Sequence, residues 1–307
     1  MTGPNSDSQV NRRRRSLAGV LYAAGAFLIW GFSPVYWKAL LSVPALEIIA
    51  HRTVWAFLFL AVLTIAQKRW VEVLRVLKTP RIMGVLFVTA ILVCINWLVY
   101  VWAVNAGYLL QASLGYFINP LVNVLLGMIF LRERLSRNQT VAVVIAGLAV
   151  IYRTVAIGQF PWVAMTLGLG FGFYGLIRKI APVTSLVGLT VETLWLVPCS
   201  AGYLIYLDLQ GQGALLRTTV AMDALLIGTG VVTAVPLLFF NLGARRINLS
   251  SVGLMQFISP TCMFLLAVAA YGEPFSVDQL GTFALIWAAL AIYSIDSFHQ
   301  FRHPTKP

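Results

Sequence analysis

Long apolar stretches follow one another along most of the chain, separated by short segments that carry polar and basic residues. Each stretch has roughly 18 to 22 residues, the length that an α-helix needs to cross a hydrocarbon layer of about 30 Å. The stretches lack the alternation of membrane β-strands, and a helix satisfies its backbone hydrogen bonds internally. The pattern therefore predicts ten membrane-spanning helices at 17–37, 45–66, 82–103, 109–131, 139–157, 160–177, 184–207, 221–242, 249–271 and 277–297.

The second half of the chain repeats the first. The segment FINPLVNVLLGMIFLRERLS around Pro120 matches FISPTCMFLLAVAAYGEPFS around Pro260, and in each copy a Glu, Glu133 or Glu273, stands 13 residues after the Pro. Each copy holds five predicted spans, an odd number, so the two copies must cross the membrane in opposite directions. An inverted 5+5 repeat of this kind is typical of secondary transporters, which bind their substrate near the membrane midplane.

Composition supports an all-α integral membrane protein. Of the 307 residues, 60% are hydrophobic and 10% charged, and the mean hydropathy of +0.85 exceeds what a soluble core of this size requires. We expect four parts: a disordered basic head (1–16), a first five-helix repeat (17–157), a second, inverted repeat (160–297) and a disordered cytoplasmic tail (298–307).

The placement of the basic residues decides what the net charge of +12 means. The connections on one side carry only Lys38, Arg153 and Arg217, and most other basic residues lie in the head, the tail and the remaining connections. Cytoplasmic loops of membrane proteins carry such an excess, so we expect two cytoplasmic termini and no nucleic-acid partner. The basic side holds Arg12 to Arg15, Lys68, Arg69, Arg75, Lys78, Arg81, Arg132, Arg134, Arg137, Arg178, Lys179, Arg245, Arg246, Arg302 and Lys306.

The span 45–66 begins with three ionisable residues, Glu47, His51 and Arg52. Desolvating a charge at the centre of a membrane helix costs about 2.5–3.5 kcal/mol on insertion scales, so such residues face a partner or a cavity. Glu47 and His51 share a helix face and predict a proton-coupling pair, while the guanidinium of Arg52 suits carboxylate, nitro or carbonyl oxygens. Alternatively, Glu47 caps the helix at headgroup level and pairs structurally with Arg52.

Further polar and aromatic residues occur where a midplane pocket would use them. The predicted substrate-binding residues are Arg52, Asn96, Trp97, Tyr100, Tyr116, Asn119, Trp195 and Gln256, and the predicted proton-coupling residues are Glu47, His51 and Glu192. The alternative for each Asn is a hydrogen bond that joins neighbouring helices. The spans 139–157 and 277–297 are nearly free of polar residues, which predicts an inner ring of eight helices with these two outside.

No cofactor or metal site is expected. Cys94, Cys199 and Cys262 are isolated within spans, without a CxxC motif or a nearby His, and no phosphate-binding Walker motif indicates ATP hydrolysis. A membrane enzyme would need a nucleophile or a metal cluster, and a sensor or scaffold would normally carry a soluble domain; both remain weaker alternatives. The oligomeric state stays open, and a monomer suffices for transport.

Seven segments together resemble the RarD-type permeases of the EamA branch of the drug/metabolite transporter superfamily. They are AFLIWGFSPVYWK, EIIAHRTVWAF, INWLVYVWAVN, ASLGYFINPLVNVLLGMIFLRER, FGFYGLIRK, VETLWLVP and FLLAVAAYGEPFS. The resemblance implies ten helices in two inverted halves, a bacterial plasma (inner) membrane location, and export of a small drug or metabolite, such as chloramphenicol or an amino-acid-like solute, by alternating access. Proton coupling and uncoupled facilitative exchange both remain open. The second copy has Ser259 where the first has Asn119, so the two halves need not contact substrate equally.

Overall fold

The computed structural model of the chain describes residues 6–105, 109–157, 162–270 and 277–302. All regular structure in these ranges is helical, which confirms the all-α prediction. The helices are α1 (Ser6–Lys38), α2 (Ala45–Ala66), α3 (Trp70–Leu77), α4 (Pro80–Asn105), α5 (Leu109–Leu131), α6 (Arg137–Ile157), α7 (Trp162–Ile180), α8 (Ser185–Leu209), α9 (Val220–Ala244), α10 (Leu249–Met255), α11 (Ile258–Leu265), the π-helix η1 (Leu266–Ala270) and α12 (Val277–Arg302).

Seven segments of the described residues are long and apolar enough to cross a membrane. They lie in α1, α2, α4, α7, α8 and α9 and in the continuous stretch from α10 to η1. The remaining three predicted spans coincide with α5, α6 and α12, where the apolar stretches of the described residues are shorter than 18 residues. The structure therefore supports a multi-pass membrane protein, and the full count of ten spans stays a prediction.

Both ends of the chain are more helical than expected. Helix α1 already begins at Ser6 and α12 continues to Arg302, so both helices extend beyond the predicted spans into the head and the tail. Residues 1–5 and 303–307 lie outside the described residues, as do Glu273 and Ser276 of the repeat match.

The short helix α3 replaces a connection for which no helix was predicted. Its valines Val73 and Val76 are buried against Leu86 of α4 and Val187 of α8, whereas Val71, Leu74 and Arg75 are exposed. At its start, Arg69 Nε donates to Glu72 Oε1 at 2.8 Å, and this hydrogen bond holds the pKa of Glu72 below its usual value. The helical spacing of Trp70, Val73, Val76 and Leu77, with Glu72 and Arg75 between them, was the signal for this helix.

The ninth predicted span, 249–271, is divided into α10, α11 and η1. Pro260 has no N–H to offer the carbonyl of Gln256, which instead accepts the N–H of Ser259 at 3.1 Å. Pro120, the counterpart of Pro260, lies inside the uninterrupted helix α5. The two copies of the repeated motif therefore differ in backbone, with the break placed at Gln256.

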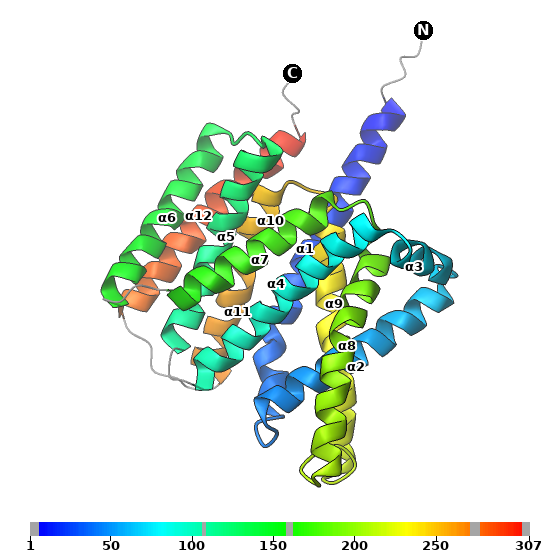
Figure 1. Cartoon of the computed structure of the whole chain (residues 1–307). Coiled ribbons are helices and arrows are strands. Elements are labelled where there is room, and N and C mark those ends of the chain that lie inside the picture. Colours follow the sequence, from blue (N-terminus) through cyan, green and yellow to red (C-terminus); the bar gives the residue numbers. More distant parts are fainter. Residues whose placement is uncertain (1–5, 106–108, 158–161, 271–276, 303–307) are drawn as a thin grey trace.

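Helices far apart in sequence pack against one another. Helix α5 packs on α7 and α10, α1 on α9 and α11, α2 on α8 and α9, and α4 on α7 and α8. Helices α6 and α12 pack mainly on each other and lie together at one edge of the bundle (Figure 1), as the absence of polar residues in these spans predicted. The start of α1 and the end of α12 lie at one end, and the connection from α8 to α9 lies at the opposite end (Figure 1).

Two glycines allow the closest of these contacts. A Cβ atom on Gly172 of α7 would lie 2.5 Å from Cγ1 of Val122 in α5, and one on Gly230 of α9 would lie 2.4 Å from the backbone of Trp55 in α2. A larger residue at either position would force the helices apart. These contacts hold the helices that surround the central cavity.

Candidate substrate-binding site

A cavity lies between helices from both halves of the chain. Seven of the eight predicted substrate-binding residues line it: Arg52, Asn96, Trp97, Tyr100, Tyr116, Asn119 and Gln256. Its wall is completed by aromatic, small and apolar residues that include Phe27, Trp30, Ser33, Pro34, Trp37, Gly115, Leu167, Phe171, Ser259 and Met263. A mostly apolar pocket with a few convergent polar groups is the usual form of a small-molecule site.

The cavity lies nearer to one end of the bundle. Val232 and Leu237 of α9, Gln256, and Ser259 and Met263 of α11 form one part of its lining. Most of the lining comes from the second half of α1 and α4 and from the first half of α2, α5 and α7. These halves point towards the end that holds the α8–α9 connection, because α1 starts at the other end (Figure 1). The cavity is therefore displaced from the end at which α1 begins and α12 finishes.

Arg52 is the charged residue of the cavity wall. Its guanidinium carbon lies 4.1 Å from the ring centre of Trp97 and 5.2 Å from that of Trp37, and its Nε donates to Oγ1 of Thr233 at 3.1 Å. Stacking on aromatic rings stabilises the cation and fixes the plane of the guanidinium. Among the described residues no carboxylate lies within 4.0 Å of it.

The amide side chains of the cavity are held by other helices. Asn96 Nδ2 donates to the carbonyl of Leu167 in α7 at 2.9 Å, which joins α4 to α7. Asn123 Nδ2 donates to Gln256 Oε1 at 2.6 Å and contacts Asn119 Oδ1 at 3.4 Å. Asn96 and Gln256 thus form hydrogen bonds with neighbouring helices, as the structural alternative predicted for the amides, and they also line the cavity.

The sequence reasoning assigned no binding role to the rings of α1 and α7. Trp30 lies 5.6 Å from Phe171 and 5.8 Å from Phe27 between ring centres, and all three line the cavity. The signal was present in the sequence, because Phe27 and Phe171 occupy matching positions of the two repeats. Trp195, in contrast, packs edge to face on Phe87 with ring centres 5.0 Å apart and is 40% exposed. This predicted binding residue is not part of the cavity lining.

Glu47 and His51 are buried together but do not line the cavity. Glu47 Oε1 lies 3.7 Å from His51 Nε2 and accepts the N–H of Ala214, in the α8–α9 connection, at 2.6 Å. His51 Nδ1 accepts from Trp55 Nε1 at 3.3 Å. Glu47 Oε2 and His51 Nε2 are buried without a hydrogen bond. Arg52, adjacent in sequence, lies in the cavity wall and forms no described ion pair with Glu47.

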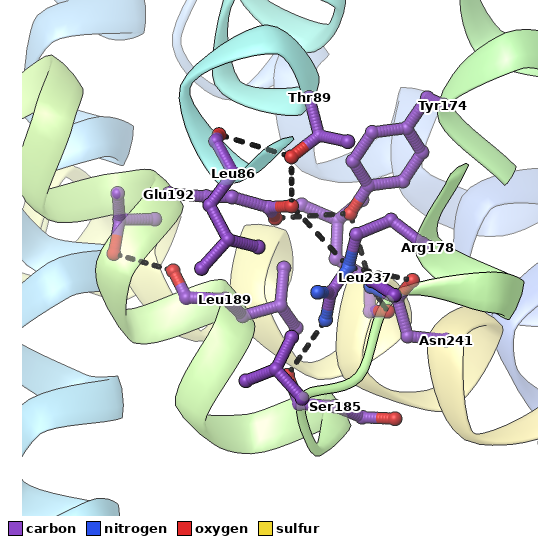
Figure 2. A network of polar contacts seen from close by, with 12 residues as sticks. Leu86, Thr89, Tyr174, Arg178, Ser185, Leu189, Glu192, Leu237 and Asn241 are labelled. Atoms are coloured by element: carbon purple, nitrogen blue, oxygen red, sulfur yellow. Dashed lines mark hydrogen bonds and ion pairs between the residues drawn. The ribbon is translucent and has the colours of Figure 1, made fainter. Parts of the chain in front are cut away.

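Glu192 belongs to a second buried polar network (Figure 2). Its Oε1 lies 3.2 Å from Nε of Arg178 and accepts from Thr89 Oγ1 at 2.5 Å, and Tyr174 OH donates to its Oε2 at 3.3 Å. Arg178 also donates to the carbonyl of Ser185 at 3.1 Å. The sequence placed Arg178 with the basic residues of the connections; the structure buries it completely. Thus Glu192 contacts an arginine of the protein itself and does not line the cavity.

The apolar helical bundle and its central cavity define a membrane transporter, and comparison with known proteins gives its family. The profile of the EamA-like transporter family matches residues 17–154. An uncharacterized transporter of Vibrio cholerae is 49% identical over 91% of this chain and 92% of its own length. Protein RarD of Escherichia coli is 43% identical over 95% and 99%. The chain belongs to the RarD-type branch of the EamA-like transporter family and is a multi-pass protein of the bacterial inner membrane.

Two more distant similarities complete the comparison. The chloramphenicol-sensitive protein RarD of Pseudomonas aeruginosa is 30% identical over 95% of this chain and 99% of its own length. A crystal structure superposes with a TM-score of 0.70 over 92% of this chain and 98% of that chain, at 18% identity. The latter similarity shows the shared fold alone.

Proposed function

We propose that this protein is a secondary transporter that binds a small drug or metabolite in the Arg52 cavity and exports it by alternating access. The observation that carries the proposal is the cavity itself, in which a guanidinium, three amide side chains and several aromatic rings from both halves of the chain converge. Chloramphenicol and amino-acid-like solutes are the substrate candidates that follow from the family. Arg52, Asn96, Asn119 and Gln256 orient the solute, and Trp97, Tyr100 and Tyr116 provide ring surface.

The ten-span inverted repeat is part of the proposal. If α1, α2, α4, α5 and α6 correspond to α7, α8, α9, α10–η1 and α12, every major packing contact has a counterpart. The contact of α5 with α7 becomes that of α10–η1 with α1, and α2 on α9 becomes α8 on α4. The contacts of α2 with α8 and of α6 with α12 map onto themselves. This exchange supports two inverted units, 17–157 and 160–297, with the cavity between them.

The distribution of charge supports an orientation with both termini in the cytoplasm. Arg75 in α3 and Arg245 after α9 belong to the end at which α1 begins, as the positive-inside rule requires. That end is tied by Glu133, whose Oε1 accepts the N–H of Leu249 at 2.7 Å, and by Lys179 Nζ, which donates to the carbonyl of Ala244 at 2.7 Å. With the cavity displaced outward, these contacts support an arrangement closed towards the cytoplasm. Export requires that they open in the alternate state.

Glu47 and His51 are the proposed proton site. Ionised Glu47 is a strong acceptor for the N–H of Ala214, and protonation would weaken that hydrogen bond and release the α8–α9 connection from α2. His51, with an unsatisfied Nε2, is placed to exchange the proton with Glu47. Glu192, the third predicted proton-coupling residue, takes part only if protonation separates it from Arg178.

Flux into proteoliposomes tests the function and the coupling together. Labelled chloramphenicol and a panel of amino acids are offered with and without an imposed pH gradient. Saturable accumulation that follows the gradient, and is lost in Glu47→Gln and His51→Ala, is the expected result. Saturable flux that ignores the gradient identifies an uncoupled exchanger instead, and absence of flux for every compound contradicts the transport proposal.

A further inference from the structure

We propose that the cavity is an anion site whose ligand is an organic monocarboxylate with an aromatic or apolar body. This inference rests on the proposed function for the cavity and adds the charge class of its ligand. The carboxylate pairs with Arg52, and the body lies among the surrounding rings. A site of this kind binds an anion more tightly than a neutral or zwitterionic compound with the same body.

The wall of the cavity carries a positive charge. Arg52 is the charged side chain among the described lining residues, and its described hydrogen bonding is limited to Nε with Thr233 Oγ1. Two other basic residues within the helices are neutralised or bonded by the protein: Arg178 by Glu192, and Lys179 by backbone carbonyls. A cation within the membrane that lacks an acidic partner is expected to face water or an anionic ligand. A ligand that carries one negative charge would therefore balance the cation of Arg52.

The geometry around the guanidinium of Arg52 suits a carboxylate. Trp97, with its ring centre 4.1 Å from the guanidinium carbon, covers a face of the cation. The five N–H donors of a guanidinium lie in its plane, so stacking leaves those of Nη1 and Nη2 available for a two-oxygen acceptor. A carboxylate presents two oxygens in matching geometry, and charge-assisted bonds of this type are stronger than bonds to a neutral amide oxygen.

The cavity wall disfavours a zwitterionic ligand. The described wall offers no carboxylate to an ammonium group, and the acceptor Gln256 Oε1 is already bonded to Asn123 Nδ2. An α-ammonium stands close to its own carboxylate, so it would lie near the guanidinium of Arg52 and be repelled by it in a medium of low dielectric constant. An amino acid is therefore expected to bind more weakly than the same acid without the amino group.

The remaining wall specifies the body of the ligand. Trp30, Phe171, Tyr100 and Tyr116 surround the space with ring surface, and the ring centres of the two tyrosines lie 6.1 Å apart. Rings pack edge to face or offset on other rings, and they accept aliphatic groups as well. An aromatic monocarboxylate satisfies both the cation and the rings.

Calorimetric titration of the purified full-length protein in lipid nanodiscs tests the charge preference directly. The probes share one body and differ in charge: 3-phenylpropionate, 3-phenylpropanamide, phenylalanine and 3-phenylpropylamine. Hexanoate and hexanamide form a second pair with an aliphatic body. We expect each carboxylate to bind about tenfold more tightly than its amide, and phenylpropionate to exceed phenylalanine by a similar factor. Equal affinity of acid and amide in both pairs, or tighter binding of phenylalanine, overturns the proposal.

Variants assign the preference to Arg52. Arg52→Gln is expected to weaken phenylpropionate binding about tenfold and to change phenylpropanamide binding by less than about threefold, with Arg52→Lys between wild type and Arg52→Gln. The matched control is Arg75→Gln on the exposed face of α3, which should change neither. A carboxylate preference that persists in Arg52→Gln overturns the assignment.

Flux of the same probes separates this inference from the transport proposal. Carboxylate binding that depends on Arg52 without flux of any solute upholds the anion site and contradicts transport. Saturable flux of chloramphenicol or phenylalanine, with no preference for the carboxylate in binding, upholds transport and contradicts the anion site.

Discussion

Two arginines within the helical bundle, Arg52 and Arg178, have opposite surroundings. Arg178 is completely buried, lies 3.2 Å from Glu192 and contacts Asn241 Oδ1 at 3.3 Å, with Nη1 alone unsatisfied. Arg52 is half-buried, stacks on Trp97 and has one hydrogen bond to a threonine. Among the described residues, Glu192 supplies the counter-charge of Arg178, and no carboxylate lies within ion-pair distance of Arg52.

This difference separates stability from function. Removing one partner of a buried, hydrogen-bonded ion pair leaves an uncompensated charge, whereas removing Arg52 leaves no described charge uncompensated. Arg178 therefore acts in the fold that joins α4, α7, α8 and α9, and Arg52 is the residue that we propose for the ligand.

Breaking the Arg178–Glu192 pair should be the most damaging change. Arg178→Met leaves Glu192 buried without its cation, and we expect a loss of about 3–5 kcal/mol in stability. Thermal unfolding followed by size-exclusion chromatography in detergent measures it. The double variant Arg178→Met with Glu192→Gln should recover part of the loss, because the remaining charge is removed. A single variant as stable as the wild type would contradict the structural role.

Gly188 provides the space that the guanidinium of Arg178 occupies. A Cβ atom on Gly188 would lie 2.1 Å from Nη1 of Arg178, so Gly188→Ala must displace the guanidinium, at a cost of about 1–3 kcal/mol. Gly202→Ala, on the same helix α8, meets no atom within 4 Å and is the matched control, expected to be neutral or slightly stabilising. Equal thermal stability of the two variants would show that Arg178 is not held at this position.

Glu133 accepts hydrogen bonds at the start of α10, and we expect it to stabilise the fold, as Arg178 does. Its Oε2 accepts the N–H of Ser250 at 2.9 Å and the hydroxyl of Ser250 at 2.7 Å. Glu133→Ala leaves these donors at the start of α10 unpaired, and we expect a loss of about 1–2 kcal/mol. Faster amide hydrogen exchange in α10, without change in α2, is the predicted signature. Unchanged exchange in α10 would contradict the stabilising role of the hydrogen bonds between Glu133 and Ser250.

The exposed pair Arg69–Glu72 is the counterpart of the buried pair and should matter least. Arg69 lowers the pKa of Glu72 mainly through a hydrogen bond, so the pair contributes stability above the ordinary pKa of Glu72. That contribution disappears as the pH falls through the lowered pKa. Because both side chains are partly exposed, Glu72→Gln should cost a few tenths of a kcal/mol at most, measured at neutral pH, and nothing in strong acid. A larger loss at acid than at neutral pH would contradict this sign.

Much of the cavity was visible in the sequence because membrane helices rarely contain polar residues without a reason. Asn96, Tyr100 and Asn119 stood out against apolar spans, and the structure brings them together with Arg52. Whether they bind substrate stays a prediction. Trp195 could not be distinguished from Trp97, because both are tryptophans near a polar residue and only packing decides which helix face meets the cavity.

Other features depended on three-dimensional contacts. Arg178 resembles a basic residue that ends a helix near the cytoplasm, and its burial follows from the approach of Gly188. Pro120 and Pro260 occupy equivalent positions, yet only the second lies at a helix break, so a proline alone did not predict the backbone. The amphipathic pattern of α3 was short enough to be taken for a loop.

The most direct test of the account compares Arg52→Gln with Arg178→Gln in two measurements, thermal stability in detergent and saturable solute flux in proteoliposomes at equal protein content. The account predicts that Arg52→Gln keeps stability within about 1 kcal/mol of wild type and loses flux, whereas Arg178→Gln unfolds at a clearly lower temperature. An Arg52→Gln protein that is as destabilised as Arg178→Gln, or that transports as well as wild type, would contradict the assignment of Arg52 to the ligand.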